Sequence, residues 1–191
     1  MMDDKTIISI YAKDRTEWRN WLLENHLKES KVNLIKYRKY TGKPSLSAKE
    51  AMEEAICFGW IDTTLKKLDD NRYMQRFSKR NKNSKWSVNT LSYGKQLMKE
   101  GKMSEAGIDA YKEGLKKKAY DHHIPKNPDS PKDFLNALIK NKKAKENFEK
   151  MAPSYRKTYI RRIEFAKRPD TRLKRIKEII ERLEDNKKWG E

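Results

Sequence analysis

The first part of the chain contains four short runs of β-branched and aromatic residues. Residues 5–12 and 32–40 have the composition of strands and partly alternate apolar with polar positions. Residues 60–65 and 72–77 flank Asp69-Asp70-Asn71, which has the composition of a tight turn, and together they predict a hairpin. The four runs predict a small antiparallel sheet of three or four strands.

Helical spacing of apolar residues marks the segments between and after these runs. Asp14 precedes one such segment and can cap a helix, with Glu17 at the third helical position. The sequence from Ser47 to Glu50 has the Ser-x-x-Glu form of a capping box. Ser87 and Ser104 are placed to cap two further helices. The fold class that these patterns predict is α+β and mostly helical.

The chain changes character at residues 116–131, where three prolines fall close together. Ser130 followed by Pro131 predicts the start of a helical part, with Ser130 as its cap. Two more helices are expected after Pro153 and Pro169, and the last one carries a clear amphipathic stripe. The predicted organisation is an α+β domain at 1–120, a proline-containing linker at 121–130, and a helical subdomain at 131–191.

The composition adds a strong positive charge to this picture. Lys and Arg number 46 against 28 Asp and Glu, which gives a net charge of +18. No run approaches the roughly 18 apolar residues of a membrane span, and residues 1–5 lack the start of a signal peptide, so we expect a cytoplasmic protein. The single cysteine, Cys57, can form neither an internal disulfide nor a thiolate zinc site, and we expect no metal and no cofactor.

Residues 72–89 form the most distinctive stretch, with six cations, three aromatic residues and no acid. Cations that neutralise phosphates, interleaved with aromatic faces, suit single-stranded nucleic acid or another polyanion. The same pattern also fits a strand edge and a solvated loop whose aromatic side chains pack inward. In the binding hypothesis the arginines hold the anion, Trp86 supplies a stacking face, and Ser and Asn side chains donate hydrogen bonds. The predicted ligand-binding residues are Trp60, Arg76, Arg80, Ser84, Lys85, Trp86, Ser87 and Asn89.

Two further positions are weighed for function. Arg172 and Arg175, at the start of the last predicted helix, could form a secondary anion site, although two amphipathic helices with basic outer faces explain them as well. No residue stands out as catalytic. Asp62 is the candidate that we retain, either as an acid or base, or in a structural ion pair with Arg76 or Arg80 across the hairpin.

Several segments resemble the YdeI/OmpD-associated, or bacteriocin-protection, family. They are residues 54–62, 69–73, 76–77, 84–89 and 101–107 with Arg80, together with the Ala-Lys-Arg-x-x-Thr-Arg sequence at 166–172. The similarity extends over nearly the whole chain. The resemblance implies antimicrobial peptide resistance or association with a porin, and it brings no established catalytic residue.

The charge of +18 limits how this resemblance applies, because like charges suppress encounter with cationic peptides. Direct binding of such peptides is therefore disfavoured. The leading hypothesis is a non-enzymatic stress-protection protein with a surface that binds nucleic acid or a phosphorylated ligand. The alternatives are an enzyme that uses Asp62 with Arg76 or Arg80 on a small anionic substrate, and a purely structural role for the family-like residues. The sequence carries no signal for an oligomeric state.

Overall fold

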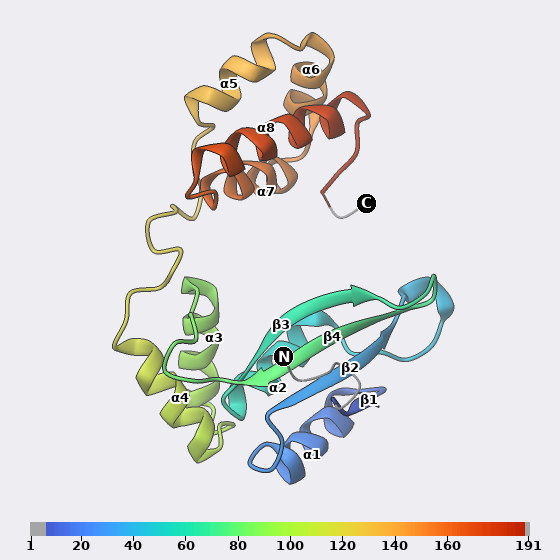
Figure 1. The fold of residues 1–191 in the computed structure, drawn as a ribbon, viewed down its shortest axis with the longest axis vertical. Coiled ribbons are helices and arrows are strands. Elements are labelled where there is room, and N and C mark those ends of the chain that lie inside the picture. The colour runs from blue at the N-terminus through green and yellow to red at the C-terminus, as the bar shows by residue number, and fades with distance from the viewer. Residues whose placement is uncertain (1–6, 190–191) are drawn as a thin grey trace. The chain divides into compact units, whose positions relative to one another are not determined.

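The computed structural model describes residues 7–189, which form two compact units at Met1–Tyr120 and Asp121–Glu191 (Figure 1). The N-terminal unit contains a small sheet with helices, and the C-terminal unit is helical. The predicted α+β class is therefore confirmed. The first two residues of the strand predicted at 5–12 lie outside the described part of the chain.

The sheet has four strands in the order β1-β2-β4-β3. Strand β2 pairs with β4, and β4 with β3, in antiparallel fashion, whereas β1 pairs with β2 in parallel. The prediction of a purely antiparallel sheet is wrong at this pair, because the helix between β1 and β2 returns the chain to the starting edge so that both strands run the same way. The strands are β1 (Ser9–Tyr11), β2 (Lys31–Tyr37), β3 (Trp60–Lys67) and β4 (Arg72–Lys79).

Side-chain caps start the helices of the N-terminal unit, as the sequence predicts. The side chains of Asp14, Ser47, Ser87 and Ser104 each accept a hydrogen bond from the backbone N–H three residues later, and Ser47 with Glu50 forms a complete capping box. A 3₁₀ turn, η2, follows β2. The elements are α1 (Arg15–Asn25), η2 (Lys39–Thr41), α2 (Ala48–Cys57), α3 (Val88–Lys99) and α4 (Glu105–Leu115).

The core of the N-terminal unit lies between the sheet and helices α1 and α2. Val32 and Leu34 on β2 point into it, and Phe77 on β4 is paired with Val32. Trp18 from α1 packs against Phe77, with the ring centroids 5.2 Å apart. Large aromatic side chains therefore fill much of this core, which compensates for the small number of branched aliphatic residues.

Helix α4 is attached to the end of α2 through one carbonyl group. The backbone N–H and the hydroxyl of Ser104 both donate to the carbonyl oxygen of Cys57, at 2.9 and 3.0 Å. Gly107, in the first turn of α4, packs directly against the same backbone. Figure 1 shows α3 and α4 beyond the end of the sheet at which β4 terminates.

The C-terminal unit is built from four short helices around its own core. The predicted helix starts at Pro153 and Pro169 are confirmed. The predicted cap at Ser130 is wrong by one residue: Pro131 has an extended ψ of 149° and occupies the cap position itself. Phe134, Phe148, Tyr159, Ile163 and Ile179 are central in the core. The helices are α5 (Lys132–Ile139), α6 (Lys142–Lys150), α7 (Pro153–Glu164) and α8 (Pro169–Glu184).

Across residues 7–189, every helix is too short or too polar to span a lipid bilayer.

Candidate functional site

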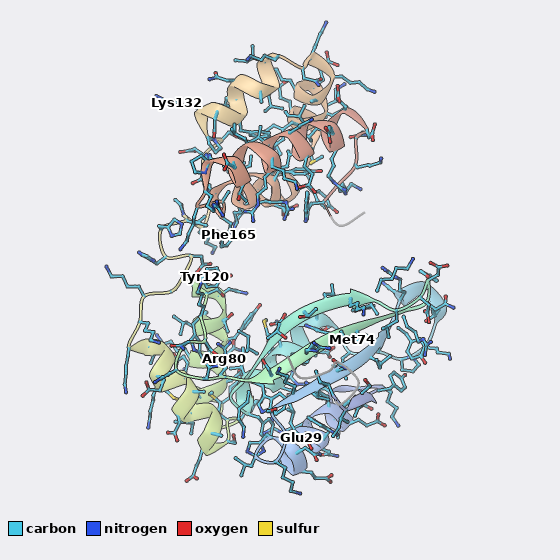
Figure 2. All side chains as sticks on the ribbon, viewed as in Figure 1. Glu29, Met74, Arg80, Tyr120, Lys132 and Phe165 are labelled. Atoms are coloured by element: carbon cyan, nitrogen blue, oxygen red, sulfur yellow. The ribbon has the colours of Figure 1, made fainter. Side chains whose placement is uncertain are left out.

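Arg80 lies where the chain leaves β4 and turns toward α3 (Figure 2). Its backbone N–H donates to the carbonyl oxygen of Gly59 at 2.8 Å, which extends the hairpin pairing by one residue. Its guanidinium carbon lies 3.6 Å from the centroid of the Trp86 ring. Nε donates to the Trp60 carbonyl at 3.2 Å and Nη1 to the Lys85 carbonyl at 3.0 Å. These contacts hold the guanidinium in one orientation.

The charge of Arg80 is not neutralised by a carboxylate. Among the described residues, no acidic side chain comes within 4.0 Å of its guanidinium, and Asp62 acts on it only at longer range. Burial lowers the pKa of Arg80 to about 10. An arginine has five N–H donors, and only two are used in its hydrogen bonds here. Arg80 is thus a partly buried cation in a fixed orientation, with further N–H donors available to a ligand.

Two hollows meet at Arg80. The first, of about 400 Å³, lies between the segment after β4 and helix α4, and its lining includes Lys79, Lys82 and Lys117. The second, of about 260 Å³, lies between α2 and the starts of β3 and α3. Since Arg80 lines both, an anion in either hollow could reach its guanidinium. The polar residues of the second hollow are Asp62, Arg80, Lys85, Ser87, Thr90 and Tyr120.

The two tryptophans predicted to contact a ligand are buried. Trp86 is only 5% exposed, since Arg80 covers one side of its ring and the Tyr111 ring packs against it with the two centroids 5.9 Å apart. Gly114 on α4 packs against the same ring. Trp60 is completely buried in the core. The ring of Trp86 is packed inside the protein, and this burial disfavours the predicted stacking role.

Arg76 and Asp62 lie on opposite faces of the sheet. Asp62 is paired with Phe77, whose side chain enters the core, and the next position along a strand points the other way. Arg76 accordingly donates from Nε to the Asn33 side chain at 2.9 Å. The hydrogen bond that Asp62 makes comes from the Gln75 side chain at 3.4 Å. The predicted ion pairs of Asp62 with Arg76 or Arg80 are therefore not formed.

The small polar residues of the run shape its turn and the following helix. The Ser84 hydroxyl oxygen accepts from the backbone N–H of Asn81 at 2.9 Å, and Ser87 accepts from that of Thr90 at 3.0 Å. Asn89 is exposed in the first turn of α3. Ser84 lines the first hollow and Ser87 the second, so both hydroxyl groups border the cavities that Arg80 joins.

Arg172 and Arg175, the residues of the predicted secondary anion site, both have partners within the protein. Arg172 makes a two-pronged ion pair with Asp133, at 2.5 and 3.1 Å, and a second one with Glu164 at 3.1 Å. The pair with Arg172 holds the pKa of the Asp133 carboxyl below its usual value. Arg175 donates to the Arg162 carbonyl at 2.6 Å. The charge of Arg172 is already balanced by two acids, which leaves it unsuited to bind another anion.

One residue of functional interest was missed by the sequence reading. Lys36 on β2 is 1% exposed, and its ammonium group donates to the Gln75 side-chain oxygen at 3.4 Å. Burial lowers its pKa to about 8. The signal was present, since Lys36 follows the buried Val32 and Leu34 at the period of two that marks one face of a strand.

The described residues contain no cluster of three or more His, Cys, Asp and Glu side chains that could hold a metal ion.

Fold and site together define a two-unit α+β protein whose N-terminal unit holds a desolvated, unpaired arginine between two hollows. Residues 10–110, more than half of the chain, match the model of a domain family of unknown function, DUF8412, and the chain belongs to that family. Residues 127–186 match the model described as bacteriocin-protection, YdeI or OmpD-associated, which confirms the resemblance seen in the sequence. No curated protein and no solved structure gives a significant match.

The motifs on which the resemblance rests fall partly within one family match and partly within the other. The Ala-Lys-Arg-x-x-Thr-Arg sequence at 166–172 falls within the bacteriocin-protection match. The segments at 54–62, 69–73 and 84–89 fall within the DUF8412 match, and so does Arg80. The candidate site therefore belongs to the domain whose family description assigns no function.

Proposed function

We propose that this chain is a non-enzymatic, cytoplasmic stress-protection protein whose N-terminal unit binds a small phosphorylated ligand at Arg80. The observation that carries the proposal is the guanidinium of Arg80, which is desolvated, fixed over Trp86 and without a carboxylate partner among the described residues. A partly buried cation is commonly paired with an acid, so one that lacks a carboxylate partner at the junction of two hollows favours an anion as its partner.

A small phosphorylated ligand explains the site better than nucleic acid does. Binding of single strands relies on exposed aromatic faces, whereas Phe77 and Trp86 are buried and Tyr73 is half-buried. Of the two explanations for the aromatic residues at 72–89, inward packing is the one that their burial supports. The cations Lys79, Lys82 and Lys85 remain exposed and would attract an anion toward Arg80.

Protection against cationic peptides would then be indirect. The net charge of +18 repels such peptides, so the protein would act through its anionic ligand and not by sequestering the peptide. The C-terminal unit, which matches the bacteriocin-protection model, is the part that this role would share with that family.

Calorimetric titration with inorganic pyrophosphate tests the proposed site. Arg80→Met removes the charge and keeps an apolar side chain over Trp86, and it should weaken pyrophosphate binding at least about tenfold. Arg162 offers a matched control, since it lies 3.9 Å from the Trp189 ring but is paired with Glu178 at 3.2 Å. Arg162→Met should leave the affinity unchanged. Equal affinities for wild type and Arg80→Met would refute the proposal.

A parallel titration with a single-stranded oligothymidylate separates the two anion classes. If the small-ligand proposal is correct, pyrophosphate competes at Arg80 while the oligonucleotide binds only weakly at physiological salt. Tight oligonucleotide binding that falls steeply with salt, and that Arg80→Met weakens, would instead identify nucleic acid as the partner.

A further inference from the structure

A broad groove lies on the sheet face that holds the core, at the hairpin end of the N-terminal unit. Its volume is about 1290 Å³, and strands β2, β4 and β3 meet residues 38–48 there. Figure 1 shows the turn η2 beside the tip of the β3–β4 hairpin, and the hydroxyl of Tyr40 in η2 donates to the Asp70 carbonyl in that tip. We name this cavity the Tyr73 groove. Its lining includes Tyr37, Glu50, Asp62, Tyr73 and Gln75.

Lys36 lies directly behind the wall of the Tyr73 groove. Its ammonium nitrogen is 3.4 Å from the Gln75 side-chain oxygen and 5.8 Å from the centroid of the Tyr73 ring. Both of these residues line the groove, while Lys36 itself is 1% exposed. A change in the side-chain rotamer of Gln75 is therefore the shortest route by which a molecule in the groove could meet the ammonium group.

No acid within the described residues forms an ion pair with Lys36. Glu50 and Asp62 influence it electrostatically, yet each carboxylate is engaged elsewhere. Glu50 accepts from the backbone N–H of Ser47 at 2.9 Å, and Asp62 accepts from Gln75 at 3.4 Å. A single long hydrogen bond to a neutral amide leaves the buried charge of Lys36 largely uncompensated.

A buried lysine of this kind lowers the stability of the native fold. A buried ammonium without a close counter-ion destabilises the native state, and an apolar side chain of similar size would pack in its place without that penalty. Positions that sacrifice stability in this way are concentrated at binding and catalytic sites. The placement of Lys36 is accounted for if the missing counter-ion belongs to a ligand.

We propose that the Tyr73 groove is a second ligand site, for a small organic carboxylate, and that Lys36 is its buried counter-charge. The bound carboxylate takes the place of the Gln75 oxygen as acceptor from Lys36, and the Gln75 amide nitrogen donates to its second oxygen. One buried ammonium balances one negative charge, which favours a carboxylate over a phosphate dianion. This site is separate from the proposed phosphate site, although Asp62 borders both the groove and the second hollow.

The residues at the rim of the groove favour a ligand that carries both a negative charge and an aromatic ring. Arg38 and Lys43 line the groove, and each lies over a tyrosine ring, at 5.9 Å from Tyr73 and 4.7 Å from Tyr37. Tyr40 is 70% exposed with its hydroxyl tied to the hairpin, so its ring is a fixed and accessible surface. Cations on the rim attract the acid, and aromatic faces suit a planar body.

Titration with benzoate tests the site. Wild type should bind benzoate, and Lys36→Met should weaken binding at least about tenfold while leaving the fold intact. Lys66→Met, at an exposed position of β3 whose strand partner is Met74, is the matched control and should bind as wild type does. Gln75→Glu supplies Lys36 with an internal carboxylate and should also weaken benzoate. The absence of benzoate binding to wild type, or unchanged binding to Lys36→Met, would overturn the proposal.

Measuring the protons taken up on benzoate binding distinguishes a lysine that contacts the ligand from a lysine with only a structural role. The titratable groups that face Lys36 are Glu50 on α2, Asp62 on β3 and Tyr73 on β4. A bound carboxylate stabilises the ammonium form, so binding at about pH 8.5 should take up a fraction of a proton, and binding at about pH 6 none. Titrations in buffers of different ionisation enthalpy measure this uptake. Zero uptake at both pH values would contradict the assigned role.

The two proposed sites can fail independently. Lys36→Met should leave pyrophosphate binding unchanged, and Arg80→Met should leave benzoate binding unchanged. Loss of both ligands in Lys36→Met would mean that the two probes share one site, and it would overturn the second site while leaving the first one standing.

Discussion

Replacing Gly107 with alanine tests how α4 is attached to the rest of the N-terminal unit. A Cβ atom at this position would lie 2.1 Å from the carbonyl oxygen of Cys57 and 2.6 Å from its carbonyl carbon. Both atoms belong to the backbone at the end of α2, so no side-chain rotation relieves the clash. The same carbonyl oxygen accepts both hydrogen bonds from Ser104, which hold the start of α4.

The net effect on stability is the difference between two opposing contributions. Alanine in place of glycine inside a helix favours folding by up to about 1 kcal/mol. Overpacking costs about 1–3 kcal/mol, and a shift of α4 would also weaken the Ser104 bonds, worth about 1 kcal/mol each. We expect Gly107→Ala to lower the free energy of unfolding by about 2 kcal/mol, which corresponds to a decrease of about 8 °C in melting temperature for a domain of this size.

Thermal unfolding followed by tryptophan fluorescence measures the effect, because four of the five tryptophans lie in the N-terminal unit. Gly101→Ala is the control. Gly101 has a φ of +65° and nothing within 4 Å of its added Cβ, so its replacement costs only backbone strain of about 1 kcal/mol. An unchanged or higher melting temperature for Gly107→Ala would show that helix propensity outweighs the clash and refute this account of the α2–α4 contact.

The other predictions concern titratable groups. Burial raises the pKa of the Cys57 thiol to about 11, so alkylation by iodoacetamide at neutral pH should be far slower in the native protein than in denaturant; equal rates would contradict this. The pair with Arg172 lowers the pKa of Asp133 from 3.8, so its contribution is present above that pH and lost as the pH falls through the lowered value; Asp133→Asn should flatten the acid limb of the stability profile, by less than about 1 kcal/mol because the pair is partly exposed. Asp62→Asn should weaken benzoate binding above about pH 8, because the charge of Asp62 raises the pKa of Lys36 and its removal leaves less of the ammonium form at that pH; unchanged or stronger binding would contradict this.

Local chemistry explains which elements of the fold are predictable from the sequence. The capping box at Ser47 and the caps at Asp14 and Ser104 are decided by residues within one helical turn, and the structure confirms them. The parallel pairing of β1 depends on where α1 returns the chain, and no local pattern specifies that. The alternation of Val32 and Leu34 places Lys36 on the inward face, but the apolar Tyr37 at the next position points to the other face and makes this register ambiguous in the sequence.

The candidate site is less predictable, since it depends on contacts between residues distant in the sequence. The sequence shows Arg172 in a basic stretch, but its partner Asp133 lies on another helix. In the sequence, Trp86 lies among cations and small polar residues, as a base-stacking residue would. In the structure, Gly114 on α4 has no side chain, and the helix therefore packs directly against the Trp86 ring. Counting cations thus locates the basic segment at 72–89, and only the packing shows that Arg80 is a partly buried cation without a carboxylate partner among the described residues.

The role of Asp62 follows from its position near Lys36 and Arg80, two cations without a carboxylate partner among the described residues. It raises the pKa values of both Lys36 and Arg80 and therefore favours their charged forms, but it forms an ion pair with neither. Its carboxylate accepts a hydrogen bond from Gln75 on the neighbouring strand, 3.4 Å away. A direct salt bridge would occupy the donors of one cation and close that site to a ligand, whereas a carboxylate at longer range keeps both cations charged and leaves their donors available. The arrangement thus favours a role for Asp62 in maintaining two anion sites over a role as an acid or base in a reaction.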